Sequence, residues 1–266
     1  MLTIRYLSLI VSLAVAHIAA GQESPDSDDV ARGTEIAREA DRRASGYIDS
    51  EESFTMVLRD SKGRERLRTM RLRTFEQTDD GDWSLTIFDE PADVKGTALL
   101  TYSHGVDPDD QWIYLPALKR VKRISSKNRS GPFMGSEFAF EDMSDFEMEK
   151  YSYRFLREES CGDLQCFVSE WIPLYPHSGY SREEVWHDQQ EYRVQKVEYF
   201  DRKGGHLKTL LLSDYRLFDE RFWRAFDWEM SNHKTGKTTL LNFNTIELGV
   251  GLTERDFDKN ALKRAK

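Results

Sequence analysis

The sequence predicts a mainly β protein, in which an antiparallel sheet of about a dozen strands curls into an open half-barrel behind an N-terminal helix. From residue 52 onward, apolar residues recur with a period of two, as in strands with one buried face. Turn residues separate these segments at short intervals, so neighbouring strands pair as hairpins. A long meander must curl to bury one face, either closing into a barrel or staying open beneath a cover. The helix and one long mid-chain loop favour the open form with a loop or helix lid.

The chain of 266 residues begins with the pattern of a secretion signal. Arg5 gives a positive start, residues 7–16 form a short apolar core, and small residues up to Gly21 offer a cleavage site. The core is too short to span a bilayer comfortably, and no cysteine follows it that would carry a lipid anchor. We therefore expect residues 1–20 to be a signal peptide and residues 21–266 to be one exported domain.

The charge of the chain argues against binding to nucleic acid. The formal net charge is −9, and removal of residues 1–20 takes away only Arg5 and leaves −10. The hydrophobic content of 39% is low, but 12% of the residues are aromatic. A mature chain of about 245 residues can bury a substantial core as one domain.

The two cysteines, Cys161 and Cys166, are expected to form a disulfide, because the chain is exported. Gly162 and Asp163 between them suit a tight turn, so the bridge would pin a hairpin. The loop that it closes is short, and the stabilisation is on the order of 2 kcal/mol. The spacing differs from that of a redox C-x-x-C motif, and zinc needs more ligands than two cysteines.

The first helix is expected to begin at Ser27 or Asp28 and to end near Ala44. Its apolar face is narrow and made of small residues, which suits close packing against a sheet: Val30, Gly33, Ala37, Ala40 and Ala44. The C-terminal tail is also expected to be helical, because Thr253 and Asp256 resemble a capping box. Phe257 and Leu262 would dock this tail.

The strand that begins near residue 64 changes its alternation after Thr69. A β-bulge there would collect the arginines on one polar face: Arg64, Arg66, Arg68, Arg71 and Arg73. Such a face is either a solvated outer surface or a patch for lipid phosphates or an acidic partner. Other strands are expected over residues 54–59, 83–87, 96–102, 112–115, 148–156, 166–172, 182–186, 192–200, 207–217, 222–229 and 238–247.

Residues 110–143 carry the most informative pattern of the chain. A strand is followed by a basic ribbon, by a loop with turn residues, and by a glycine-spaced aromatic cluster. The cluster either plugs the end of the core or forms a mobile flap over an apolar ligand. As walls or flap of an apolar cavity we predict Trp112, Tyr114, Phe133, Met134, Phe138 and Phe140. The ribbon is either an ordinary solvated strand or a docking surface for headgroups or a partner, formed by Lys119, Arg120, Lys122 and Arg123.

The sequence contains no recognisable catalytic or metal-binding constellation. There is no G-x-S-x-G elbow and no phosphate loop, and the histidines lack ligand spacing. One acidic group is either a pair of carboxylates for acid–base chemistry or a solvated loop: Glu137, Glu141, Asp142, Asp145 and Glu147. We therefore predict neither an enzyme nor a cofactor nor a metal site.

The order of several short motifs resembles the bacterial outer membrane lipoprotein-sorting protein family. These motifs are FDEPADVKGTALL at 88–100, QWIYLP at 111–116, KRVKRI at 119–124, FMGSEF at 133–138, and Glu141-Asp142. They cover residues 88–143, and the strand meander fits the rest of the mature chain. This family is related to the periplasmic carrier LolA.

The resemblance implies a LolA/LolB-like open barrel with a helical lid around an apolar cavity for acyl chains. It implies a periplasmic, non-enzymatic carrier that shuttles a lipid or lipoprotein between envelope membranes, with peripheral membrane contact. Relatives are associated with RND-type (MMPL-like) exporters, which makes such an inner-membrane transporter the expected partner. The alternative is an envelope lipid sensor or regulatory scaffold that uses the same fold.

Overall fold

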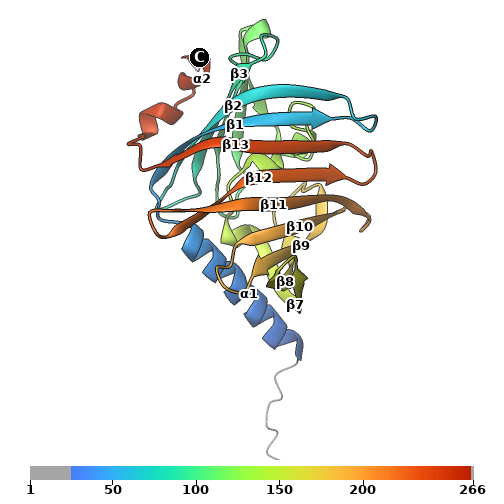
Figure 1. Ribbon diagram of the computed structural model, residues 1–266. Helices are drawn as coiled ribbons and strands as arrows, with labels where there is room; N and C mark the ends of the chain where they lie inside the picture. The colour runs from blue at the N-terminus through green and yellow to red at the C-terminus, as the bar shows by residue number, and fades with distance from the viewer. Residues whose placement is uncertain (1–24, 265–266) are drawn as a thin grey trace, which may run out of the picture.

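The computed structural model describes residues 25–264, so the predicted signal peptide at residues 1–20 lies outside the described residues. One helix, α1 (Pro25–Ala44), precedes a single antiparallel sheet of 13 strands in this part of the chain (Figure 1). The strands are β1 (Asp49–Arg59), β2 (Glu65–Phe75), β3 (Trp83–Glu90), β4 (Ala98–Tyr102), β5 (Asp110–Leu115), β6 (Arg120–Ile124), β7 (Tyr151–Cys161), β8 (Leu164–Pro173), β9 (Tyr180–Asp188), β10 (Val194–Asp201), β11 (His206–Phe218), β12 (Phe222–Asn232) and β13 (Thr238–Leu248).

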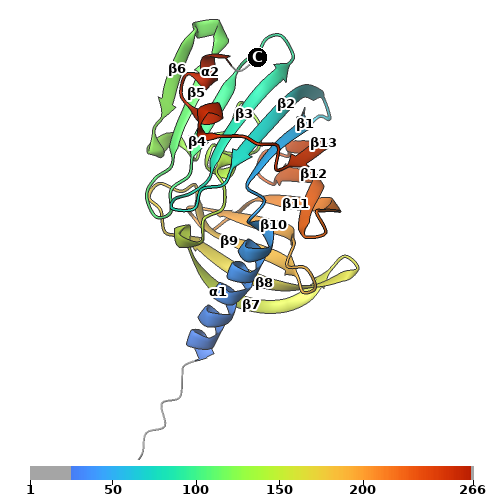
Figure 2. The ribbon, with the colours of Figure 1, turned by 90° about the vertical axis from the view of Figure 1, so that its left-hand side faces the viewer.

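The order of the strands leaves the sheet open. It runs β6-β5-β4-β3-β2-β1-β13-β12-β11-β10-β9-β8-β7, so β6 and β7 are the two edges. These two strands are consecutive in the chain, and the segment between them must therefore cross from one edge of the curled sheet to the other. Figure 2 shows this arrangement, with β6 and β7 at opposite ends of the sheet. The predicted open, half-barrel fold is confirmed.

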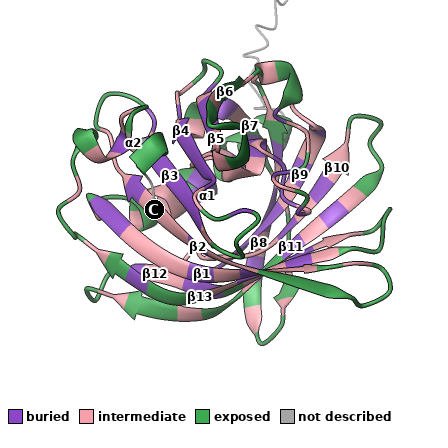
Figure 3. Cartoon of the chain, turned by 90° about the horizontal axis from the view of Figure 1, so that it is seen from above, coloured by how far each residue is buried: buried purple, intermediate pink, exposed green. Residues whose placement is uncertain are grey.

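Strand alternation gives the sheet a concave face that holds the main apolar core. Phe54 on β1 is paired with Met70 on β2, which is paired with Phe88 on β3, and paired residues point to the same face. All three side chains belong to one buried cluster with residues of β4, β5 and β8–β13. Seen from above, buried residues recur along the strands around the opening (Figure 3).

The helix α1 packs against β7, and its Ala37 joins the concave cluster. Gly33 allows the helix to approach the strand closely, because a Cβ at this position would lie only 2.6 Å from the backbone carbonyl carbon of Arg154. Arg32, beside it, stacks its guanidinium 3.7 Å from the ring centroid of Phe155. The middle of the predicted face, Gly33 and Ala37, therefore packs closely on the sheet, whereas Val30 and Ala44 at its two ends are exposed.

A second apolar cluster covers the convex face at β3–β5. The C-terminal segment, with the short helices η5 (Glu254–Phe257) and α2 (Ala261–Arg264), crosses this face (Figure 2). Thr253 and Asp256 form the predicted capping box, and Phe257 and Leu262 are buried. The predicted docking of the tail is confirmed.

The predicted disulfide between Cys161 and Cys166 is present. It joins the ends of β7 and β8 across the turn at Gly162, whose φ of +63° suits glycine. The bridge therefore pins this hairpin, as the sequence predicts.

The prediction of one arginine face on β2 is wrong. A bulge does lie at Thr69–Met70, but the extra residue is Asp89 on β3, and the pairing of β2 with β1 is regular. Arg66 and Arg68 therefore point to the concave side with Met70. Arg71 and Arg73 have the opposite parity and lie on the convex side. Arg71 Nη2 lies 2.8 Å from Asp89 Oδ1, and Arg73 Nε lies 2.5 Å from Glu51 Oε2.

Candidate functional site: the concave face and its flap

The segment that crosses the opening contains an irregular hairpin, residues 129–143, which we call the flap. Phe133 N donates to Phe138 O at 2.7 Å, and Phe140 N donates to Gly131 O at 3.0 Å. Met134, at the tip, has a positive φ of +50°, which reverses the chain there. The flap is therefore a defined structure with its own hydrogen bonds.

The aromatic residues of the flap fill the concave face. Phe133 and Phe138 are 0% and 2% exposed, and the Phe133 ring centroid lies 5.7 Å from that of Phe88 on β3. Phe140 and Met134 pack partly buried against the same cluster. The structure thus brings together the four predicted flap residues.

The other two predicted wall residues lie elsewhere. Trp112 and Tyr114 alternate with Ile113 on β5, and only Ile113 belongs to the concave cluster. Trp112 packs on the convex face with Phe257, and Lys259 Nζ lies 3.9 Å from the centroid of its ring system. The prediction that Trp112 and Tyr114 line the cavity with the flap is corrected here, because the C-terminal segment covers them.

The basic ribbon forms the edge of the sheet. Lys119 precedes β6, and all four basic residues are exposed: Lys119, Arg120, Lys122 and Arg123. Arg123 is ion-paired with Asp110 on the neighbouring strand. The structure places this ribbon beside the opening, with one long edge unpaired in the described sheet.

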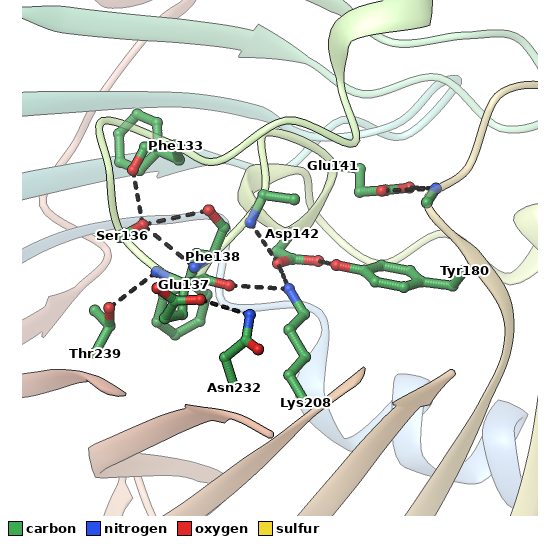
Figure 4. Close-up of polar contacts among 12 residues, drawn as sticks. Phe133, Ser136, Glu137, Phe138, Glu141, Asp142, Tyr180, Lys208, Asn232 and Thr239 are labelled. Atoms are coloured by element: carbon green, nitrogen blue, oxygen red, sulfur yellow. Dashed lines mark hydrogen bonds and ion pairs between the residues drawn. The ribbon is translucent and has the colours of Figure 1, made fainter. Parts of the chain in front are cut away.

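Polar groups of the floor hold the flap in place (Figure 4). Lys208 Nζ, on β11, donates to Asp142 Oδ2 at 2.5 Å and to Glu137 O at 3.1 Å. Tyr180 OH donates to the other oxygen of Asp142 at 2.6 Å, and Asn232 Nδ2 donates to Glu137 Oε2 at 2.7 Å. These contacts join the flap to three strands: β9, β11 and β12.

Glu141 makes a second attachment beside Asp142. Its carboxylate accepts bonds from Gly179 N at 2.9 Å, Ser178 Oγ at 3.0 Å and Tyr175 OH at 3.1 Å. Burial raises the pKa of Glu141, and the charge of Asp142 adds to the effect. Glu141 and Asp142 are therefore buried structural groups, in contrast to the solvated loop that was one of the two expectations.

The flap is also fixed on its apolar side and at its base. Arg68, on the concave side of β2, donates from Nη1 to Met134 O at 2.7 Å. At the base, Asp109 pairs with Arg129 and with Lys150, whose Nζ lies 2.6 Å from Asp109 Oδ1. Bonds to the tip and to the base therefore close the flap over the concave face.

The sequence was not used to predict Lys208 as a site residue, and Arg68 was placed on a polar arginine face, although a signal for the concave side was present in both strands. Lys208 shares its strand parity with Leu210, and Arg68 shares its parity with Met70. A Lys or Arg that has the same strand parity as apolar residues points to the same face of the sheet as they do, and a charge on the apolar face is uncommon.

Two recesses lie near the sheet surface. One, of about 410 Å³, opens at the tip of the flap between the β1–β2 and β12–β13 turns, and Leu58, Arg66, Gly135 and Thr239 are among its lining residues. The other, of about 680 Å³, lies on the convex face beside the disulfide hairpin. The first recess is the place where the flap meets the open rim.

Among residues 25–264, no helix is both long and apolar enough to cross a membrane. In the same part of the chain, no group of three or more His, Cys, Asp or Glu side chains is arranged to hold a metal ion.

Comparison with known proteins relates this fold to a bacterial family. A family model described as "Uncharacterized protein" matches residues 80–264, and no curated protein matches. A putative outer membrane lipoprotein-sorting protein domain from Vibrio parahaemolyticus is 50% identical, with a TM-score of 0.87 over 88% of this chain and 100% of that chain.

Two further solved structures share the fold. A DUF1329 family protein from Desulfovibrio piger is 27% identical, with a TM-score of 0.84 over 88% of this chain and 99% of that chain. A LolA superfamily protein from Nitrosomonas europaea is 21% identical, with a TM-score of 0.70 over 86% of this chain and 98% of that chain. The chain belongs to the outer membrane lipoprotein-sorting protein family and has the fold of the LolA superfamily.

Proposed function

We propose that this protein is a periplasmic carrier that binds the acyl chains of a lipid or lipoprotein on its concave face and shuttles them between envelope membranes. An inner-membrane exporter of the RND or MMPL type is the proposed donor. Family membership supports a lipid-carrying role, and the open sheet supplies an apolar face of suitable shape. In this proposal the protein binds its cargo and does not transform it.

The observation that carries the proposal is that flap aromatics occupy the apolar face in the closed form. Phe133 and Phe138 are buried there, and they exchange for an apolar chain when the flap lifts. Exposing two such side chains costs roughly 3–6 kcal/mol. Burying about 12 methylene groups gains roughly 10 kcal/mol. The free energy gained by binding the chain therefore exceeds the cost of exposing the two rings, and the difference is small enough for later release.

Locking the flap tests this exchange. Glu137 N donates to Thr239 Oγ1 at 2.9 Å, so the two residues are adjacent across the rim. The double variant Glu137→Cys, Thr239→Cys would join the flap to β13 when it is oxidised. We expect the oxidised variant to transfer a fluorescent phospholipid between donor and acceptor vesicles at least about tenfold more slowly than its reduced form, because each release requires flap opening.

The single variant Glu137→Cys and the wild-type protein, each with and without reductant, control for loss of the Glu137 side chain and for reduction of the native disulfide. The proposal would be contradicted if the oxidised, cross-linked variant transferred lipid at the same rate as the wild-type protein. Wild-type protein that binds the lipid but never transfers it would instead favour a lipid sensor.

A further inference from the structure

Lys208 is a buried cation, and among residues 25–264 both hydrogen-bond partners of its ammonium belong to the flap. Its side chain is 3% exposed, and the Asp142 side chain that pairs with it is 6% exposed. Its Nζ donates to one carboxylate oxygen and one carbonyl oxygen, both on the flap. When the flap lifts, Lys208 therefore loses both oxygen partners while its strand stays in the floor.

The floor itself keeps the Lys208 ammonium in position. The ammonium lies 5.0 and 4.9 Å from the ring centroids of Tyr180 and Tyr199, which are on β9 and β10. Cation–π attraction to these rings remains after the flap leaves. An unpaired ammonium at such a site is costly unless an anion replaces the flap carboxylate.

Two further donors point at the side-chain carboxylates of the same two flap residues, Asp142 and Glu137. Tyr180 OH bonds Asp142, and burial holds the pKa of Tyr180 well above its usual range, so the hydroxyl keeps its proton. Asn232 Nδ2 bonds Glu137, and the amide is fixed because its Oδ1 accepts from the backbone of Lys234 and Thr235. The floor therefore presents one cation and two neutral donors toward the flap.

The floor also holds a buried carboxyl, that of Glu183 on β9. Glu183 lies on the same concave row as Tyr199 and is 6% exposed, and its carboxyl makes no hydrogen bond or ion pair with any of residues 25–264. Burial raises the pKa of Glu183 well above its usual range, and the charges of Asp142 and Glu141 add to this effect. Burial therefore favours the uncharged acid form of Glu183, and a carboxylic acid can itself donate to an oxyanion.

We infer that Lys208, Tyr180 and Asn232 form a binding site for an anionic phosphate or carboxylate group, and that the flap carboxylates of Asp142 and Glu137 occupy this site when the protein is empty. The inference rests on the proposed carrier function and adds the chemistry of the cargo's head. The head displaces Asp142 from Lys208 as the chain displaces the flap aromatics. The recess at the flap tip is lined by Glu137, whose carboxylate bonds Asn232, so this recess opens beside the site.

Amphiphiles that share one twelve-carbon chain test the inference. Dodecyl phosphate, dodecyl maltoside and dodecyltrimethylammonium are titrated into the full mature chain by calorimetry, each below its critical micelle concentration. We expect dodecyl phosphate to bind at least about tenfold more tightly than the maltoside, because charge-assisted bonds to the floor add to the same chain contacts. Inorganic phosphate alone is the fourth ligand.

The variant Lys208→Met removes the cation and keeps an unbranched apolar side chain. We expect it to reduce the preference for phosphate over maltoside by about tenfold or more, with maltoside affinity little changed. Lys196→Met is the matched control, because Lys196 lies on the convex side of β10 against Trp186 and pairs with Glu198. Asp142→Asn removes the competing carboxylate and should increase the preference for phosphate, which provides a test if Lys208→Met does not fold.

The outcomes separate the inference from the carrier proposal. Equal affinity of wild-type protein for phosphate and maltoside, or an unchanged preference in Lys208→Met, overturns the anion site and leaves the carrier intact. Failure of all three amphiphiles to bind overturns both. If dodecyl phosphate binds tightly and inorganic phosphate does not bind, the site belongs to the head of a lipid. If dodecyl phosphate and inorganic phosphate both bind, and both depend on Lys208, the anion site is supported and a soluble phosphate is a second source of its ligand.

Discussion

At the scale of single residues, three buried carboxyl groups determine how the stability of the fold depends on pH. Asp82, Asp145 and Glu147 lie where the chain leaves the flap and passes the start of β3, and Glu147 Oε1 accepts a bond from Asp82 N at 3.2 Å. Burial raises the pKa of each of these carboxyls to about 7, and neighbouring carboxylates add to the effect. Asp145 Oδ2 is buried with no hydrogen-bond partner among the described residues.

These groups predict a protein that is more stable in mild acid. Because the folded-state pKa of Asp145 is about 7 and its ordinary value is 3.8, the folded state binds the proton more tightly. Its stabilising contribution is complete below about pH 4 and is lost as the pH rises through 7. The variant Asp145→Asn should therefore be more stable than the wild type at pH 8, by on the order of 2 kcal/mol, and this difference should shrink as the pH falls towards 4.

Thermal unfolding of both proteins at pH 5 and pH 8 measures this difference. The account is contradicted if the Tm of the wild type rises between pH 5 and pH 8, or if Asp145→Asn follows the pH dependence of the wild type.

Lys208 shows what sequence could and could not reveal about a single residue. Its place among apolar residues of one parity indicates a charge on the buried face. Its partner Asp142 is 66 residues away in the chain, and no local pattern links the two. The same holds for Arg68, whose acceptor is a backbone carbonyl 66 residues distant. The local conformation was predictable, and the pairing depends on how the sheet curls.

At the scale of elements, the edge strand β6 carries exposed basic side chains that are not needed for packing of the sheet. Its basic residues are exposed on an edge strand, and we propose that they dock the opening onto an anionic surface such as phospholipid headgroups. An edge rich in positive charge also resists pairing with another strand, which is the alternative reason for its composition.

The double variant Arg120→Gln, Lys122→Gln distinguishes these two roles. Each basic residue near an anionic membrane contributes about 1 kcal/mol, so the variant should bind vesicles rich in anionic lipid roughly 10–30-fold more weakly, and added salt should remove the difference. The matched control is Lys203→Gln, Lys237→Gln, which removes two exposed lysines from the β10–β11 and β12–β13 turns. Cosedimentation measures both, and an equal loss in the control would contradict a docking role for β6.

Which elements form was largely predictable, but which face each presents to the core was not. Period two, turn residues and the capping box indicated the strands, hairpins and tail. Trp112 and Tyr114 were assigned to the cavity because they are apolar and alternate, yet β5 is apolar on both faces because the C-terminal segment covers its convex side. On β2, the bulge residue belongs to the partner strand, so one strand's own sequence could not locate it.

At the scale of the whole molecule, topology explains why a flap exists. The chain builds one wing of the sheet outward to β6, crosses the opening, and builds the other wing inward from β7 until β13 pairs with β1. The crossing segment is thus tied at both edges and carries apolar and acidic side chains that match the floor below it. One chain therefore provides the apolar face, its cover and the polar contacts that hold the cover in place.

Mass spectrometry of lipids extracted from the protein, purified gently from a bacterial periplasm, tests the carrier proposal most directly. The account predicts a defined acylated molecule in about one-to-one ratio with the chain, as a single concave face would hold. A protein that is empty on isolation, and still empty after incubation with membranes and its exporter, would contradict the proposal that this face carries lipid.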